Sequence, residues 1–246
     1  MKKTPPLKVE DWPIPSPENM KRVGPTEVEK FIHNGLQLFY ALDEEMRLAT
    51  GADPRRLNVL DFGCGCGRVA TPYIAANGRL TGVDIDASAI EFLKTHYPDH
   101  DFRTTQFEPP LPFDDSTFDA VYSISIWSHL NKDSGERWLR EIYRILKPGG
   151  VFLMSIMSHT SLIFRHARPG AEWDDISNRD LRREGALFRE YAFLQSHQDA
   201  YPGVTDSYGS TFYDDDYVRT NWSKVFSSVE VLPGRMAGQD LVILKK

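Results

Sequence analysis

The chain has 246 residues, of which 41% are hydrophobic and 26% charged, as is ordinary for a globular protein with one substantial α/β core. Its formal net charge of -6 argues against a strongly electrostatic nucleic-acid binder, because the neutralisation of phosphates requires clustered Lys and Arg. The first residues lack the apolar core of a signal peptide, and no run approaches the roughly 18 apolar residues of a membrane span, so we expect a cytoplasmic protein without a membrane partner.

The N-terminal segment, residues 1–25, is rich in proline. Proline locks the backbone and removes a hydrogen-bond donor, so this segment is predicted to be an extended arm without a regular helix, with Trp12 as a possible anchor. An amphipathic helix is predicted next, because Thr26 and Glu29 form a capping-box pattern and apolar residues recur at helical spacing up to Gly51. Residues 26–246 are predicted to form a single domain.

From residue 57 onward, strand and helix patterns alternate as in a parallel sheet with crossover helices. The predicted strands are residues 58–62, 80–83, 101–105, 118–124, 151–155, 229–233 and 240–244, and the predicted helices are 67–76, 88–98 and 133–147. Ser88 with Glu91, and Asp133 with Glu136, are the capping boxes that place two helix starts. The last two strands are predicted to pair as an antiparallel hairpin. The fold class is therefore α/β, a doubly wound, mostly parallel, seven-stranded Rossmann-like sheet.

The regular alternation stops after Ser158. Residues from about 160 to 207 are polar, charged and aromatic, with a helical pattern at 187–195, and we predict a lid insertion that precedes the last two strands. A further helix is predicted at 210–226.

The segment Val59-Leu-Asp-Phe-Gly-Cys-Gly-Cys-Gly-Arg68 carries glycines at alternating positions, and a second apolar run ends at Asp84. Glycine lets the backbone approach a ligand closely, and a carboxylate closing the next strand can accept both hydroxyls of a ribose. Arg68 stands where a dinucleotide fingerprint has its last glycine, which disfavours a nicotinamide oxidoreductase. Asp61 would repel a pyrophosphate but suits a cationic ligand with an ammonium group. S-adenosylmethionine is such a ligand.

With these motifs the chain resembles the class I S-adenosylmethionine-dependent methyltransferases over about residues 57–155. The likeness is carried by the segments 59–68, 82–86, 111–119, 127–130 and 146–150, in the order and at the spacing of that family. The resemblance implies a Rossmann-like methyltransferase fold, S-adenosylmethionine as cofactor, S-adenosylhomocysteine as product and no metal. The two cysteines, Cys64 and Cys66, are too few for a structural zinc site.

The resemblance also implies cofactor contacts. The glycine loop would underlie the methionine and ribose, Asp61 would reach the amino group, Asp84 would hold the ribose diol and Ile85 would pack on the adenine. For Asp84 the alternative is a helix-capping carboxylate. Many relatives have an Asp before the Leu-Pro-Phe turn, where this chain has Gln106 and Phe107, so Gln106 is our prediction for the adenine amino group. The predicted cofactor residues are Asp61, Gly63, Cys64, Gly65, Gly67, Asp84, Ile85, Gln106, Phe107 and Ser123.

A general base assists methylation of a hydroxyl, and histidine has a suitable intrinsic pKa. His129 follows the fourth predicted strand, at the edge where open α/β sheets bind ligands, and is the candidate base, although it could instead brace the loop. His159 is a weaker candidate and His197 weaker still. Trp127 and Tyr208 are the predicted acceptor contacts, with plain packing as the alternative for each.

We predict transfer of a methyl group to a small-molecule acceptor, with a hydroxyl of a sugar, glycan or natural product favoured. The alternatives are N-methylation, or a catalytically silent protein that binds S-adenosylmethionine as a regulatory or partner subunit. A nucleic-acid amino group is disfavoured, because the Glu108-Pro-Pro-Leu111 segment precedes the fourth strand, whereas the similar tetrapeptide of DNA amino methyltransferases follows it. The lid aromatics that suit a small acceptor are Trp173, Phe188, Tyr191, Phe193, Tyr201 and Tyr208.

Overall fold

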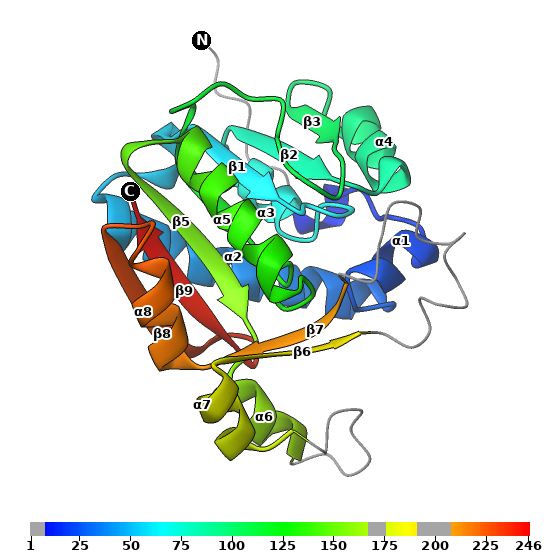
Figure 1. Ribbon diagram of the computed structural model, residues 1–246. Helices are drawn as coiled ribbons and strands as arrows, with labels where there is room; N and C mark the ends of the chain where they lie inside the picture. Colours follow the sequence, from blue (N-terminus) through cyan, green and yellow to red (C-terminus); the bar gives the residue numbers. More distant parts are fainter. Residues whose placement is uncertain (1–7, 167–175, 191–207) are drawn as a thin grey trace. The chain divides into compact units, whose positions relative to one another are not determined.

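The computed structural model describes residues 8–166, 176–190 and 208–246 and contains a seven-stranded sheet of strand order β3-β2-β1-β4-β5-β9-β8 (Figure 1). Its strands are β1 (Val59–Phe62), β2 (Leu80–Asp84), β3 (Asp101–Thr104), β4 (Phe118–Ser123), β5 (Leu146–Ile156), β8 (Ser228–Met236) and β9 (Gln239–Lys245). A second, two-stranded sheet pairs β6 (Ala186–Glu190) with β7 (Gly209–Tyr213) in antiparallel fashion. The predicted α/β class with a mostly parallel seven-stranded sheet is confirmed, and the insertion before the last two strands contains two strands that the sequence did not predict.

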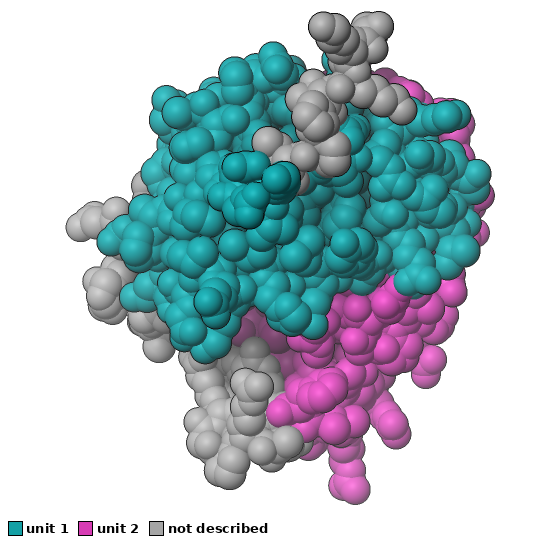
Figure 2. Space-filling view, turned by 180° about the vertical axis from the view of Figure 1, so that it is seen from behind, with its two compact units in different colours: residues 1–105, 118–122 teal, residues 106–117, 123–246 magenta. Residues whose placement is uncertain are grey.

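The chain divides into two compact units, residues 1–105 with 118–122, and residues 106–117 with 123–246, which Figure 2 colours separately. In the first unit, β1 pairs in parallel with β2 on one side and with β4 on the other, and β2 pairs in parallel with β3. All four residues of β1 are buried, as expected for a central strand with both faces covered. The strand order reverses between β1 and β4, and open α/β sheets bind ligands at the carboxyl ends of strands at such a point.

The N-terminal segment of the first unit contains two short helices, the 3-10 helix η1 (Val9–Asp11) and the α-helix α1 (Pro17–Arg22). The prediction that proline excludes a helix here is wrong. Pro17 occupies the first helical turn, where a missing N–H costs nothing, and Ser16 caps the helix by accepting a hydrogen bond from the Asn19 amide at 3.2 Å. Trp12 is buried, as expected of an anchor.

Three further helices belong to the first unit: α2 (Val28–Thr50), α3 (Ala70–Ala75) and α4 (Ala87–His96). The predicted capping boxes at Thr26 and Ser88 are wrong. Glu27 is the N-cap of α2 and makes no side-chain capping bond. Asp86 caps α4, accepting from the amides of Ser88 and Ala89 at 3.0 and 3.3 Å. Aspartate and serine are equally good N-caps, so residue type alone does not decide whether α4 is capped at Asp86 or at Ser88.

In the second unit, β9 pairs antiparallel with both β5 and β8, which confirms the predicted hairpin. Helix α5 (Lys132–Ile145) is capped by Asn131, which accepts from the Ser134 amide at 2.9 Å, so the predicted cap at Asp133 is wrong. Helix α5 ends at Ile145 and β5 begins at Leu146, five residues before the predicted start of the strand. Helix α8 (Asp215–Trp222) packs against β8 (Figure 1).

The insertion of the second unit contains α6 (His159–His166) and α7 (Asn178–Glu184), followed by β6 and β7. The predicted helix at 187–195 is wrong over residues 187–190, which form β6, and its remainder lies outside the described residues. The predicted helix at 210–226 is wrong over 210–213, which form β7, and correct for α8. Strand β6 obtains its hydrogen bonds from β7, more than 20 residues later, and a local pattern does not reveal such a partner. Of the helices described, none has the length and apolar character to cross a bilayer.

Candidate functional site

The glycine loop follows β1 in the first unit, where the sequence places it. Gly63, Gly65 and Gly67 have φ values of 81, 51 and 88°, in the left-handed region that favours glycine. The amides of Gly63 and Cys64 donate to the Val83 carbonyl at 2.8 and 3.0 Å, which fastens the loop to the end of β2. The loop is thus a backbone-lined turn held against the neighbouring parallel strand.

Asp84 ends β2, and its carboxylate binds the glycine loop directly. One oxygen accepts from the Gly65 amide at 2.7 Å and the other from the Asp86 amide at 2.8 Å. A carboxylate has about four lone-pair sites, so capacity remains for the two hydroxyls of a ribose. Because Asp86 caps α4, the alternative that Asp84 is the helix cap does not hold.

Asp61 lies on β1 opposite Tyr122 of β4, and the Tyr122 hydroxyl donates to its carboxylate at 2.9 Å. The side chain is buried, with 3% of the residue exposed. Burial is the main cause that raises the pKa of Asp61 to about 8, while the Tyr122 hydrogen bond opposes the rise and the charge of Asp84 adds to it. Burial also raises the pKa of Asp84. Burial disfavours the ionised forms of these two neighbouring carboxyl groups, and a positively charged ligand bound beside them would stabilise those forms.

The remaining predicted loop residues differ in exposure. Ile85 is 37% exposed and presents apolar surface beside Asp84. Cys64 and Cys66 are buried, and burial raises the pKa of the Cys66 thiol to about 12 and that of Cys64 well above its usual value. Both thiols therefore stay protonated and serve as small packing groups. No cluster of three or more metal-ligating side chains occurs in the part of the chain that the structure describes.

Arg68 has a role that its position in the motif did not reveal. Its guanidinium donates to the Val23 carbonyl at 2.7 Å and to the Asn34 side chain at 3.0 Å, so it ties the N-terminal segment and α2 to the glycine loop. A Cβ at Gly35 would lie 2.2 Å from the Arg68 carbonyl oxygen. A lone glycine inside a strongly helical segment was the sequence signal for this close approach.

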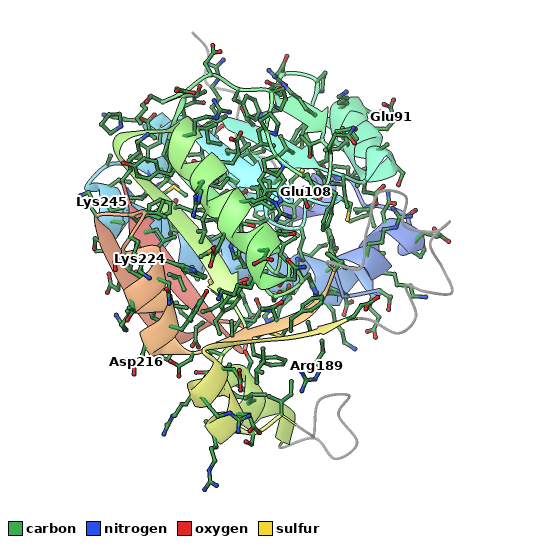
Figure 3. The ribbon with its side chains drawn as sticks, in the orientation of Figure 1. Glu91, Glu108, Arg189, Asp216, Lys224 and Lys245 are labelled. Carbon is green, nitrogen blue, oxygen red and sulfur yellow. The ribbon has the colours of Figure 1, made fainter. Side chains whose placement is uncertain are left out.

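In the second unit, the predicted adenine contacts lie on the loop before β4. Gln106 is exposed, Phe107 is half-buried with its carbonyl accepting from the Trp138 indole at 3.1 Å, and Ser123 is fully buried at the end of β4. Glu108, labelled in Figure 3, receives two hydrogen bonds from Arg137 of α5 at 2.9 and 2.8 Å. Glu108 therefore has a structural partner in the same unit.

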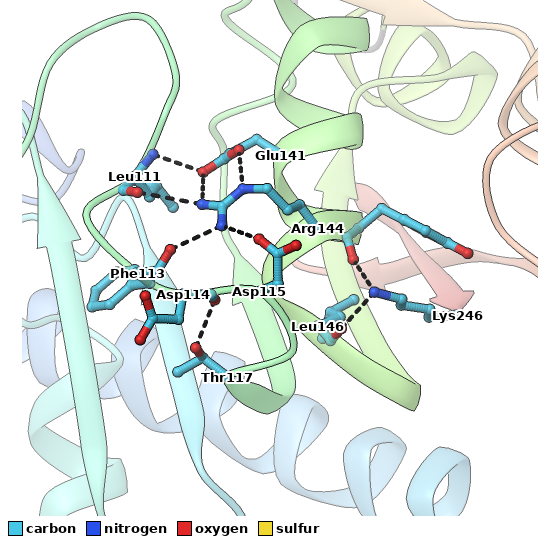
Figure 4. A network of polar contacts seen from close by, with 10 residues as sticks. Leu111, Phe113, Asp114, Asp115, Thr117, Glu141, Arg144, Leu146 and Lys246 are labelled. Carbon is cyan, nitrogen blue, oxygen red and sulfur yellow. Dashed lines mark hydrogen bonds and ion pairs between the residues drawn. The ribbon is translucent and has the colours of Figure 1, made fainter.

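The same loop is bound to α5 by a network of polar contacts (Figure 4). Glu141 is buried and accepts from the Leu111 amide at 2.7 Å. Arg144 donates to Glu141, to Asp115 and to the carbonyl of Phe113, at 2.7 to 2.9 Å. The loop that carries Gln106 and Phe107 is thus held by charged side chains rather than by secondary structure.

His129 follows β4 and lies against Tyr208, just before β7. Its Nδ1 is 2.9 Å from the Gly209 carbonyl oxygen. A carbonyl can only accept, so Nδ1 carries a proton and donates this hydrogen bond. The ring stacks on Tyr208 at 5.1 Å, and Tyr208 meets Phe107 edge-on at 6.4 Å. The structure therefore brings three of the predicted residues, His129, Tyr208 and Phe107, into one aromatic cluster.

His159 and Trp127 have surroundings of a different kind. The His159 ring bridges two side chains, with Nδ1 2.7 Å from Asn178 and Nε2 2.9 Å from Asp214, so both ring nitrogens hold structural contacts. Trp127 is fully buried and packs edge-on against Phe152 at 5.1 Å. These placements favour His129 as the base and Tyr208 as the acceptor contact. The predictions for His197, Trp173, Tyr191, Phe193 and Tyr201 lie outside the described residues.

Residues 60–154 match a family model described as a methyltransferase domain. The chain is 31% identical over 121 residues to a ubiquinone biosynthesis O-methyltransferase of Maricaulis maris, covering 48% of this chain and 47% of that protein. It is 38% identical over 104 residues to a demethylmenaquinone methyltransferase of Symbiobacterium thermophilum, covering 39% of this chain and 41% of that protein. The chain thus spans about half the length of the curated relatives it matches.

Among solved structures, the fold is similar to a magnesium protoporphyrin IX methyltransferase of Synechocystis PCC 6803 with bound S-adenosylhomocysteine, with a TM-score of 0.55, 15% identity and 93% of each chain covered. It is also similar to the PH0226 protein of Pyrococcus horikoshii OT3, with a TM-score of 0.55, 19% identity and coverage of 85% of this chain and 88% of that chain. At these identities the likeness shows the fold.

Proposed function

We propose that this chain, whose residues 60–154 match the methyltransferase-domain model, is a class I S-adenosylmethionine-dependent methyltransferase that transfers a methyl group to a hydroxyl of a small molecule that contains a flat ring. The observation that carries the proposal is the pair of carboxyl groups at the glycine loop, buried Asp61 and half-buried Asp84. They suit a nucleoside whose other end carries positive charge.

The residues of the loop fit this cofactor. Gly63, Gly65 and Gly67 have positive φ values that glycine readily adopts, so the loop can turn sharply after β1. Asp84 would accept the ribose hydroxyls, and exposed Ile85 would cover one face of the adenine. Asp61 would accept from the ammonium group directly or through water, which would offset the burial of its charge. When bound, S-adenosylmethionine supplies a methyl group on a positively charged sulfur.

For the acceptor, the aromatic cluster of His129, Tyr208 and Phe107 supports the proposal. Its faces suit stacking on a flat ring. His129 would take the proton of an acceptor hydroxyl as that oxygen attacks, with Nδ1 of the ring held by the Gly209 carbonyl. The sugar or glycan acceptor that we favoured from sequence has no support among the relatives named above, both of which are named for quinones.

The test is methyl transfer from radiolabelled S-adenosylmethionine to a panel of dihydroxyarenes, sugars and aryl amines, with the labelled products identified by mass spectrometry. We expect label on a ring hydroxyl. Label on an amine nitrogen or on a sugar would overturn the hydroxyl-ring acceptor while retaining the reaction. Binding of S-adenosylhomocysteine with no transfer to any acceptor class would favour the catalytically silent alternative.

A further inference from the structure

Helix α1 contacts the glycine loop within the first unit. The Cys66 thiol donates to the Asn19 carbonyl at 3.5 Å, and the Ser88 hydroxyl donates to the Asn19 side chain at 3.0 Å. Apolar contacts surround these bonds. The members of the apolar cluster are Met20, Phe31, Cys66 and Ala89, with Val23, Ile32 and Phe92 packed against them. Helix α1, which precedes the first strand by more than 30 residues, therefore packs directly on the glycine loop and on the start of α4.

The C-terminal end of α1 is attached to the turn after β2. Arg22 forms an ion pair with Asp86, whose side chain is 14% exposed. Asp86 in turn caps α4 and donates its own amide to Asp84 at 2.8 Å. Only Ile85 separates Asp84 from Asp86. Arg22 is thus linked, through one residue, to the predicted ribose carboxylate and the predicted adenine contact.

The turn after α1 is attached to the glycine loop itself. The Val23 carbonyl accepts from Arg68 at 2.7 Å. The Val23 side chain lies so close to the loop that a Cβ on Gly65 would be 2.5 Å from its Cγ1. The segment 16–24 therefore contacts both strand-to-helix turns that carry the predicted nucleoside contacts, the one after β1 and the one after β2.

We propose that residues 16–24 are a positioning element of the cofactor site, and that the Arg22–Asp86 pair couples the docking of α1 to cofactor binding. This inference rests on the proposed function. The element acts through the turns it holds: while α1 is docked, Asp84 and Ile85 stay in the arrangement that a nucleoside requires. Because coupling between two equilibria is reciprocal, the bound cofactor must stabilise docking of α1 to the same degree.

The test is calorimetric titration of S-adenosylhomocysteine into the full-length protein and its Arg22→Gln variant. We expect the Kd of the variant to be about three- to tenfold higher, as for loss of a partly exposed ion pair that orders a binding loop. The matched control is Arg56→Gln, which makes the same substitution at an exposed arginine of the same unit and should leave Kd within about twofold.

A double-mutant cycle identifies the pair as the cause. Asn is also a good helix cap, so Asp86→Asn removes the charge of Asp86 while retaining the start of α4. In the Asp86→Asn background, Arg22→Gln should produce no further change in Kd. Hydrogen exchange gives the reciprocal readout: saturating S-adenosylhomocysteine should slow exchange of the amides of residues 18–24 in the wild-type protein and less so in Arg22→Gln.

Equal Kd values for wild type, Arg22→Gln and Arg56→Gln would overturn the inference, and so would a lower Kd for Arg22→Gln, which would mean that α1 opposes binding. A fall in melting temperature for Arg22→Gln without a change in Kd or in ligand-dependent exchange would also overturn it, because a purely structural role predicts that result. Absence of binding by the wild-type protein would overturn the proposed function and this inference together.

Discussion

At Asp61, burial opposes the negative charge of the ionised carboxyl group. Its carboxyl group has a pKa of about 8 in the ligand-free protein, mainly because burial removes water from the ionised form. A ligand ammonium group favours that ionised form. Binding should therefore release a proton at any pH below about 8, and this coupling makes the cofactor affinity depend on pH.

We predict that the affinity for S-adenosylhomocysteine rises as the pH increases from 6 to about 8, by at most about tenfold per unit, and levels off above that range. Calorimetry in two buffers of different ionisation enthalpy should count up to about one proton released at pH 7. Asp61→Asn, which has no proton to lose, should bind more weakly at pH 8 and show almost no dependence on pH. A wild-type affinity that is constant over this range would contradict the role of Asp61.

The same group affects the stability of the ligand-free protein in the opposite sense. Its folded pKa of about 8 lies above the usual value of 3.8, so between these values the folded chain holds a proton that the unfolded chain has released. The stabilisation is therefore fully present below about pH 4 and is lost as the pH rises through 8. The melting temperature of Asp61→Asn relative to wild type should increase between pH 5 and pH 8.5.

His129 is the proposed base, and its Nδ1 is held by the Gly209 carbonyl. His129→Ala should lower turnover by about two orders of magnitude, because proton transfer from the acceptor loses its positioned partner. The affinity for S-adenosylhomocysteine should be unchanged. His33→Ala, at an exposed histidine, is the control. If the turnover of His129→Ala stays within about twofold of wild type, His129 is not the base and only stabilises its loop.

At the scale of elements, the contact between α2 and the glycine loop depends on Gly35. In an open helix, Gly→Ala stabilises by about 1 kcal/mol. Here the added Cβ would lie 2.2 Å from the Arg68 carbonyl, so backbone must move. We predict that Gly35→Ala lowers the free energy of unfolding by about 1 to 3 kcal/mol, as overpacking does, and weakens cofactor binding by displacing the loop. Denaturant titration measures the sign of the change in the free energy of unfolding. An increase for Gly35→Ala would contradict the close approach of α2 to the Arg68 carbonyl.

The loop before β4 is held by the contacts of Arg144, whose pKa is raised, first of all by its hydrogen bonds to Glu141. Arg144→Gln removes the cation that faces buried Glu141 and the hydrogen bond that this cation donates to the Phe113 carbonyl. We predict a loss of about 1 to 3 kcal/mol in the free energy of unfolding, because the buried carboxylate of Glu141 loses a charged, partly exposed partner. Arg140→Gln, exposed on the same helix, should change it by less than about 0.5 kcal/mol. Equal effects of the two variants on the free energy of unfolding would show that the Arg144 contacts do not stabilise the loop before β4.

The helices and strands also show how far local pattern extends. The sequence predicts β1 to β4 and the β8–β9 hairpin because their apolar runs are bounded by turn residues. It does not predict β6 and β7, whose pairing partners are distant in the chain. It also misses α1. Proline is common both in extended segments and at the first position of a helix, and the prediction of an extended arm left out Ser16, the N-cap that distinguishes the two cases.

For the whole molecule, the strand order places the reversal between β1 and β4, and the glycine loop, Asp61 and Tyr122 all belong to these strands or follow them. Motif spacing sufficed to predict the cofactor loop, since its geometry is built from neighbouring residues. It could not predict the attachments of Arg22, Arg68 and Gly35, which join segments more than 30 residues apart. Acceptor contacts depend still more on such long-range placement.

The central claim is that Asp84 and the glycine loop bind the nucleoside of S-adenosylmethionine. The most direct measurement is calorimetric titration of S-adenosylhomocysteine at pH 8 into wild type, Asp84→Ala and the exposed-site control Asp99→Ala, with melting curves to verify folding. We predict binding by wild type and by the control, and a loss of about 1 to 3 kcal/mol for Asp84→Ala, or roughly 5- to 150-fold in Kd. No heat from the wild-type protein, or equal affinity in all three, would contradict the account.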